Sequence, residues 1–159
     1  MRMSTKAQYA VRALVSLNLN GDGSPVSIKT ISAFENISLN YLEQLFVKLR
    51  RGEIVRSVRG PGGGYVLARP ASEIRVDQII DTVEETLVPV SCMENDGSCN
   101  CNSQCATQSV WVGLGDQIRS FLASLTLDDL TKEGRKRLST ENSNVGAVPE
   151  AFGAMERHR

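Results

Sequence analysis

The feature that most constrains the fold is a succession of three helix-like segments and a hairpin within the first 70 residues. Each helix-like segment has apolar residues at helical spacing and follows a side chain that can cap its first turn. Two β-prone runs, 54–58 and 65–67, then flank a turn rich in glycine and proline. We expect helices over 5–20, 28–35 and 39–51, capped by Ser4 or Thr5, by Ser27 and by Ser38. This order of elements predicts a winged helix, mainly α with a small β-hairpin wing.

The third helix-like segment is amphipathic. One face carries Leu42, Leu45, Phe46 and Leu49, and the other face is polar. In a helix–turn–helix pair, the second helix enters the major groove, where amide and carboxylate side chains can read base edges. Basic side chains would neutralise phosphates, and an arginine beside the wing glycines suits a narrow minor groove. The candidate DNA-binding residues are Asn40, Glu43 and Gln44 for bases, Lys48, Arg51 and Arg56 for phosphates, and Arg59 for the minor groove.

The charge distribution supports a polyanionic partner for the first half only. Residues 1–80 carry 11 lysines and arginines against 6 acidic residues, whereas residues 81–159 carry 7 against 12. Because the two halves cancel, the formal net charge of zero conceals this asymmetry. Helix–turn–helix patterns also occur in protein–protein modules, so an interaction module remains an alternative.

Four cysteines, Cys92, Cys99, Cys101 and Cys105, lie within fourteen residues among small polar residues. The start of the chain does not resemble a signal peptide, and no run is apolar enough to span a membrane. We therefore expect a cytoplasmic protein, where clustered cysteines serve more often as metal ligands than as disulfides. Thiolates suit both zinc and iron–sulfur clusters. The wide first gap matches zinc knuckles poorly, but spacing alone leaves the metal open.

The second half predicts a long helix and a tail. Apolar residues recur at helical period over 106–125, on a face with little chain left to cover it. This face suits a dimer interface, with packing against its own domain as the alternative. The expected organisation is a DNA-binding domain (1–85), a cysteine loop (86–105), a dimerisation helix and a short helix capped by Thr126 (106–133), and a disordered tail (134–159). No nucleophile has an evident base partner, so an enzyme is not expected.

The pattern of the whole chain resembles the IscR-type iron–sulfur regulators, in the winged-helix family that also holds NsrR and RirA. The strings that carry the resemblance are residues 7–11, 37–46, 57–65 and 105–111, and together they span about residues 1–130. The resemblance implies a homodimer with crossing C-terminal helices and a [2Fe–2S] cluster near them. It also implies promoter DNA as the target, regulation of iron–sulfur cluster biogenesis genes, and the iron–sulfur assembly machinery as cluster donor.

The resemblance also implies the cluster ligands. Cys92, Cys99 and Cys105 match the three cysteine ligands, although the first gap is one residue longer here. Where IscR-type proteins have a histidine ligand, this chain has Gln108. An amide oxygen is a weak ligand beside thiolates, so either Gln108 or the extra Cys101 can be the fourth ligand, or Cys101 is a bystander. In related sensors a ligand comes from the partner's first helix, where this chain carries Gln8.

Two rival functions remain at this point. One is a nitric-oxide or redox sensor of the same family, with a [4Fe–4S] cluster in the same loop. The other is a zinc-stabilised module that binds protein rather than DNA. Metal content and salt-dependent DNA binding separate these rivals from an iron–sulfur-responsive repressor or activator.

Overall fold

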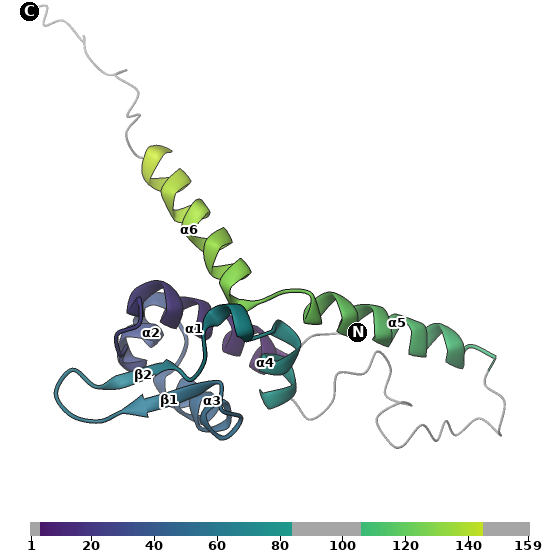
Figure 1. Ribbon diagram of the computed structural model, residues 1–159, viewed down its shortest axis with the longest axis horizontal. Coiled ribbons are helices and arrows are strands. Elements are labelled where there is room, and N and C mark those ends of the chain that lie inside the picture. Colours follow the sequence, from purple (N-terminus) through teal and green to yellow (C-terminus); the bar gives the residue numbers. More distant parts are fainter. Residues whose placement is uncertain (1–3, 84–105, 145–159) are drawn as a thin grey trace, which may run out of the picture.

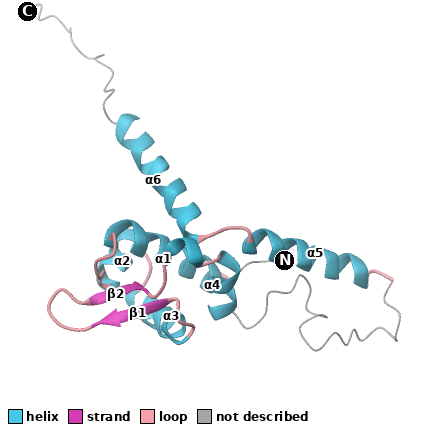
Figure 2. Cartoon of the chain, viewed as in Figure 1, coloured by secondary structure: helices cyan, strands magenta, loops and turns pink. Residues whose placement is uncertain are grey.

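The computed structural model describes residues 4–83 and 106–144, and Figure 1 shows their arrangement. Four helices and a hairpin form one body, from which two further helices project in different directions (Figures 1 and 2). The elements are α1 (Thr5–Gly21), α2 (Ile28–Glu35), α3 (Leu39–Arg51), β1 (Val55–Val58), β2 (Gly64–Leu67), the 3-10 turn η1 (Ala71–Glu73), α4 (Val76–Val83), α5 (Gln108–Ala123) and α6 (Leu127–Asn144). The order confirms the predicted fold, a mainly α winged helix with a long helix after it.

The first three helices begin at the predicted serines. The hydroxyl oxygens of Ser4, Ser27 and Ser38 each accept a hydrogen bond from the backbone N–H three residues later, at 3.1–3.4 Å. Each bond satisfies one amide that the first helical turn leaves without a partner. Asn36 ends α2 in the left-handed conformation, with φ 52°, which asparagine adopts more readily than most residues.

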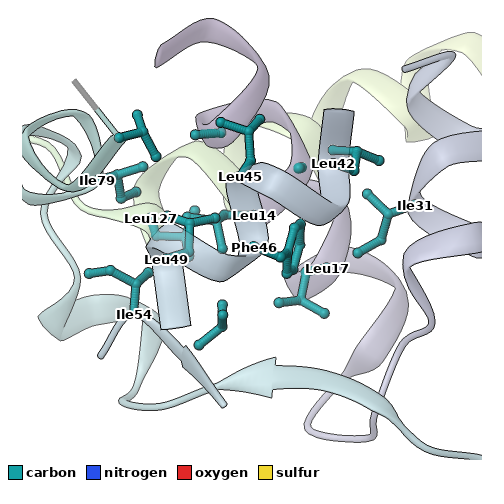
Figure 3. Packing of buried hydrophobic residues seen from close by; sticks show 14 of the residues in the cluster. Leu14, Leu17, Ile31, Leu42, Leu45, Phe46, Leu49, Ile54, Ile79 and Leu127 are labelled. Atoms are coloured by element: carbon teal, nitrogen blue, oxygen red, sulfur yellow. The ribbon is translucent and has the colours of Figure 1, made fainter. Parts of the chain in front are cut away.

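The hydrophobic core lies where α1, α3, α4 and the hairpin meet (Figure 3). The apolar face of α3 supplies Leu42, Phe46 and Leu49, all fully buried. The Phe46 ring meets the ring of Tyr65 from β2 edge to face, with centroids 4.8 Å apart. Leu127, the first residue of α6, also packs into this core. The recognition helix α3 therefore packs against α1, α2, α4 and both strands of the hairpin. Phe34 of α2 lies three residues after the buried Ile31, at the spacing of an inward residue, but is 66% exposed.

The hairpin is held to the start of the helix–turn–helix by its second strand. β1 and β2 pair antiparallel, with Val55 opposite Leu67. Tyr65 exchanges two backbone hydrogen bonds with Val26, at 2.8 and 3.0 Å, so Val26 adds a short bridge beside β2. A Cβ on Gly64 would lie 2.3 Å from the carbonyl oxygen of Val26, a distance that no side chain permits. Gly64 is needed here because two backbones approach closely.

We therefore expect Gly64→Ala to lower the free energy of unfolding by about 3 kcal/mol, since backbone rather than a movable side chain must shift. Gly60→Ala in the same hairpin is the matched control. A Cβ there meets no atom within 4 Å, although φ is +102°, so we expect a loss of only about 1 kcal/mol. Chemical denaturation measures both, and equal losses would show that the contact with Val26 is not limiting.

The C-terminal helix is longer than the sequence predicts. Thr126 caps α6 as expected: its hydroxyl accepts from the Asp129 N–H at 3.2 Å and donates to the Asp129 carboxylate at 2.6 Å. The bond that the Thr126 hydroxyl donates to the Asp129 carboxylate, followed by the one that the Thr126 N–H donates, lowers the pKa of Asp129 below its ordinary value.

The prediction of a disordered tail from residue 134 is wrong for residues 134–144, because α6 continues to Asn144. Two ion pairs stabilise the polar helix, and each joins residues one helical turn apart: Asp128–Lys132 and Glu133–Arg137. Gly134 lies against α1, where an added Cβ would be 3.4 Å from Cδ1 of Leu19. The remainder of the expected tail, 145–159, lies outside the described residues. Across residues 4–83 and 106–144, none of the helices is long and apolar enough to cross a membrane.

Candidate nucleic-acid interface and cysteine segment

The outward face of α3 presents a continuous polar stripe. Asn40, Glu43, Gln44 and Arg51 are all exposed, on the side opposite the buried leucines. Val47 lies in the same stripe and is 37% exposed, although the sequence analysis did not select it. An apolar side chain on such a face can contact a thymine methyl group. The missed signal was the spacing, since Val47 follows Gln44 by three residues and precedes Arg51 by four.

Lys48 differs from the other candidates on α3. Its side chain is half-buried, and its Nζ donates a hydrogen bond to the backbone carbonyl of Val83 at 3.1 Å. Val83 lies in the last described turn of α4. The structure therefore brings Lys48 to α4 rather than leaving it on the polar stripe.

The wing candidates lie on and beside the hairpin turn. Arg56 is exposed on β1, and Arg59 is exposed at the start of the turn. Gly60 and Gly62 have φ values of 102° and 73°, which bring the chain around tightly next to Arg59. The geometry leaves both guanidinium groups available to a phosphate backbone or a groove.

Contacts among the first three helices fix the direction of α3. Tyr41 of α3 meets the Tyr9 ring of α1 edge to face, at 5.6 Å between centroids. The Arg12 guanidinium lies over the Tyr9 ring, 5.6 Å from its centroid, and its Nε pairs with the Glu35 carboxylate at 3.0 Å. An Arg12 Nη2 also donates to the Glu35 carbonyl at 2.7 Å. These contacts join α1, α2 and α3 around the start of the recognition helix.

The segment that contains the four cysteines joins α4 to α5. Cys92, Cys99, Cys101 and Cys105 lie outside the described residues. Gln108 is the first residue of α5 and is exposed, and Gln8 is exposed on α1. Within residues 4–83 and 106–144, His, Cys, Asp and Glu side chains form no group of three that could hold a metal ion.

The α5 helix has an uncovered apolar face. None of its residues is buried, and Val110, Leu114 and Phe121 are 59%, 42% and 64% exposed. These three residues follow one stripe of the helix. Among the described residues, α5 contacts the body near its C-terminal end, where Leu122 packs against a small cluster on α1 and α4 and Arg119 pairs with Asp81 of α4 at 3.1 Å. The alternative of a helix packed fully on its own domain is therefore not what the structure shows.

The chain matches known transcriptional regulators over most of its length. The family described as "Rrf2: Iron-dependent Transcriptional regulator" matches residues 3–133. The regulator IscR of Escherichia coli K12 is 42% identical over 130 residues, which cover 82% of this chain and 80% of IscR. The solved structure of IscR from T. potens has a TM-score of 0.71 at 36% identity and covers 84% of this chain and 88% of that one. CymR of B. subtilis, described as the global cysteine regulator, has a TM-score of 0.72 at 32% identity, over 84% of this chain and 98% of that one.

These matches confirm that the chain is a regulator and not an enzyme. They also confirm the resemblance to IscR-type proteins. The structure agrees with them, since a helix–turn–helix with an exposed polar stripe precedes a hairpin wing. The chain belongs to the Rrf2 family of transcriptional regulators.

Proposed function

We propose that the protein is a cytoplasmic homodimer that binds promoter DNA in response to an iron–sulfur cluster and controls genes of iron–sulfur cluster biogenesis. The observation that carries the proposal is the position of the four-cysteine segment. It begins where α4 contacts the recognition helix, and it ends where the exposed helix α5 begins. The similarity to IscR supports the choice of regulated genes and of the assembly machinery as cluster donor.

DNA binding follows from the exposed groups. Asn40, Glu43 and Gln44 present hydrogen-bonding groups that suit base edges in a major groove. Arg51, Arg56 and Arg59 supply positive charge beside them. Glu43 repels phosphate while it can accept a hydrogen bond from cytosine, so it favours particular sequences by penalising others.

Homodimer formation is supported by the uncovered face of α5. A second copy of the same helix would cover Val110, Leu114 and Phe121 in an isologous contact. Two copies would also present two recognition helices, as operators with paired half-sites about 34 Å apart demand.

The donor chemistry suits an iron–sulfur cluster. Cys92, Cys99 and Cys105 would hold it, with Cys101 or Gln108 as the fourth ligand, and thiolates are the ligands that such clusters take. The bound cluster would be of the [2Fe–2S] or [4Fe–4S] type, and its occupancy would depend on the supply of iron and sulfur. The chain itself would couple this occupancy to DNA binding, because the ligands lie between α4 and α5 in the sequence.

Anaerobic purification followed by iron, sulfide and zinc analysis tests the proposal directly. We expect a coloured protein with matched iron and sulfide. We also expect different DNA dissociation constants for the cluster-loaded and cluster-free forms at fixed salt. Zinc without sulfide, in a protein with no salt-dependent DNA binding, would instead support a protein-interaction module. Selective loss of a [4Fe–4S] cluster with nitric oxide would support the nitric-oxide sensor.

The arginines and the base-reading residues should respond differently to substitution. Arg51→Ala and Arg56→Ala are expected to weaken binding to all sequences and to reduce the slope of log K against log salt by about two each, because each change removes one phosphate contact from each protomer. Gln44→Ala is expected to keep the salt slope and to lose about tenfold of its preference for one base pair. Fluorescence anisotropy on a panel of promoter variants measures both. Equal loss of slope in the Gln44 variant would contradict its role in base reading.

A further inference from the structure

The recognition helix contacts α4 at a point directly before the cysteine segment. Lys48 donates from its Nζ to the Val83 carbonyl at 3.1 Å in a partly buried position. Val83 itself is buried in the core with other apolar residues of α3 and α4. Cys92 follows it nine residues later in the chain. The Lys48–Val83 hydrogen bond therefore joins the recognition helix to the residue from which the chain continues toward the cysteines.

The end of α3 and the last described turn of α4 also approach each other closely at a second point. A Cβ placed on Gly52, the C-cap of α3, would lie 2.5 Å from Cγ2 of Thr82. Thr82 cannot turn away freely, because its hydroxyl donates to the Gln78 carbonyl at 2.7 Å. A displacement of the last turn of α4 toward α3 would therefore press on the end of α3, since close-packed groups transmit shifts.

The other end of α4 is anchored. The Val76 N–H donates to the Leu125 carbonyl at 3.0 Å, and the Leu127 N–H donates to the Ile74 carbonyl at 2.8 Å. The Asp77 carboxylate lies inside the first turn and accepts two hydrogen bonds from the Arg75 guanidinium, each 3.0 Å long. With its start fixed in this way, α4 can respond to the cysteine segment mainly at its C-terminal turn.

We propose that Lys48 is a positioning residue that couples the cysteine segment to the recognition helix through the Val83 carbonyl. Its ammonium is used for this contact and not for a DNA phosphate. The inference rests on the proposed function and adds to it the route by which the cluster state reaches DNA. It also removes Lys48 from the set of phosphate contacts that the sequence predicts.

Three variants of the full-length protein test this role. Lys48→Met keeps the apolar stem and removes the donor, Lys48→Arg keeps a donor, and Arg51→Met removes an exposed charge from the same helix. In Lys48→Met we expect the ratio of cluster-free to cluster-loaded dissociation constants to move toward one by about three- to tenfold, with the salt slope unchanged. Lys48→Arg should retain most of the wild-type ratio. Arg51→Met should weaken both forms equally and lower the slope by about two, one for each protomer.

Hydrogen exchange in the cluster-free protein provides a readout that needs no cluster. Lys48→Met should speed the exchange of amides in the last turn of α4, whereas Arg51→Met should not. If Lys48→Met behaves like Arg51→Met in affinity and exchange, the inference is overturned while the proposed function stands. If the cluster-loaded and cluster-free forms of the wild-type protein bind DNA with equal affinity, the proposed function fails and the inference fails with it.

Discussion

Leu114→Asp is expected to yield a monomer that binds a two-half-site promoter about 100-fold more weakly than the wild-type protein does. Leu114 lies near the middle of α5, between Val110 and Phe121 on the exposed stripe. A carboxylate there would be desolvated in the interface that we propose, without a partner of opposite charge in the isologous contact. The affinity falls because each monomer then binds one half-site alone, without the gain from a linked second site.

Ser120→Asp is the matched control. It introduces the same charge into an exposed part of the same helix, next to Phe121 but away from the stripe. Sedimentation should show a monomer only for Leu114→Asp, and circular dichroism should show the same helix content in both, because Leu114 is not buried in a single chain. A dimeric Leu114→Asp variant would contradict the assignment of this face.

Most of the body could be predicted because its signals are local. Each serine cap acts on an amide three residues away, and Asn36 adopts its left-handed conformation within a single turn. The buried face of α3 follows from a helical period alone. Likewise, the resemblance of the wing and recognition-helix strings identified the family before any contact was known. The helix predicted over 106–125 is observed as Gln108–Ala123, and its exposed face follows from the scarcity of chain left to cover it.

What the sequence could not show depends on contacts between distant residues. Lys48 and Val83 are 35 residues apart, so the sequence gives no sign of their hydrogen bond. A basic residue on a polar helix face is then predicted to contact phosphate. From the sequence, Gly52 is simply a glycine after the last residue of a helix. The structure shows in addition that Thr82 excludes a side chain at this position. The continuation of α6 past Gly134 rests on ion pairs and on packing against α1, which hydrophobic periodicity does not register.

The fourth cluster ligand can be assigned by paired substitutions in the cysteine segment. Cys92→Ser, as the reference, is expected to reduce bound iron and sulfide to near zero, because it removes one of the three matched ligands. We expect Cys101→Ser to shift the visible absorption spectrum and to speed cluster loss, since a thiolate is a stronger ligand for iron–sulfur clusters than an amide oxygen. Gln108→Ala, in the exposed first turn of α5, should then leave the spectrum unchanged.

The reverse pattern, with a spectral change only in Gln108→Ala, would assign the ligand to α5 and make Cys101 a bystander. If a variant loses the difference in DNA affinity between its cluster-loaded and cluster-free forms without a spectral change, the substituted residue acts on DNA binding rather than on the cluster. If neither variant alters the spectrum, the ligand lies elsewhere, and the partner subunit's Gln8 becomes the next residue to replace. Each outcome also bears on sensing, because a weakly held cluster is lost at a higher iron supply than a cluster held by four thiolates.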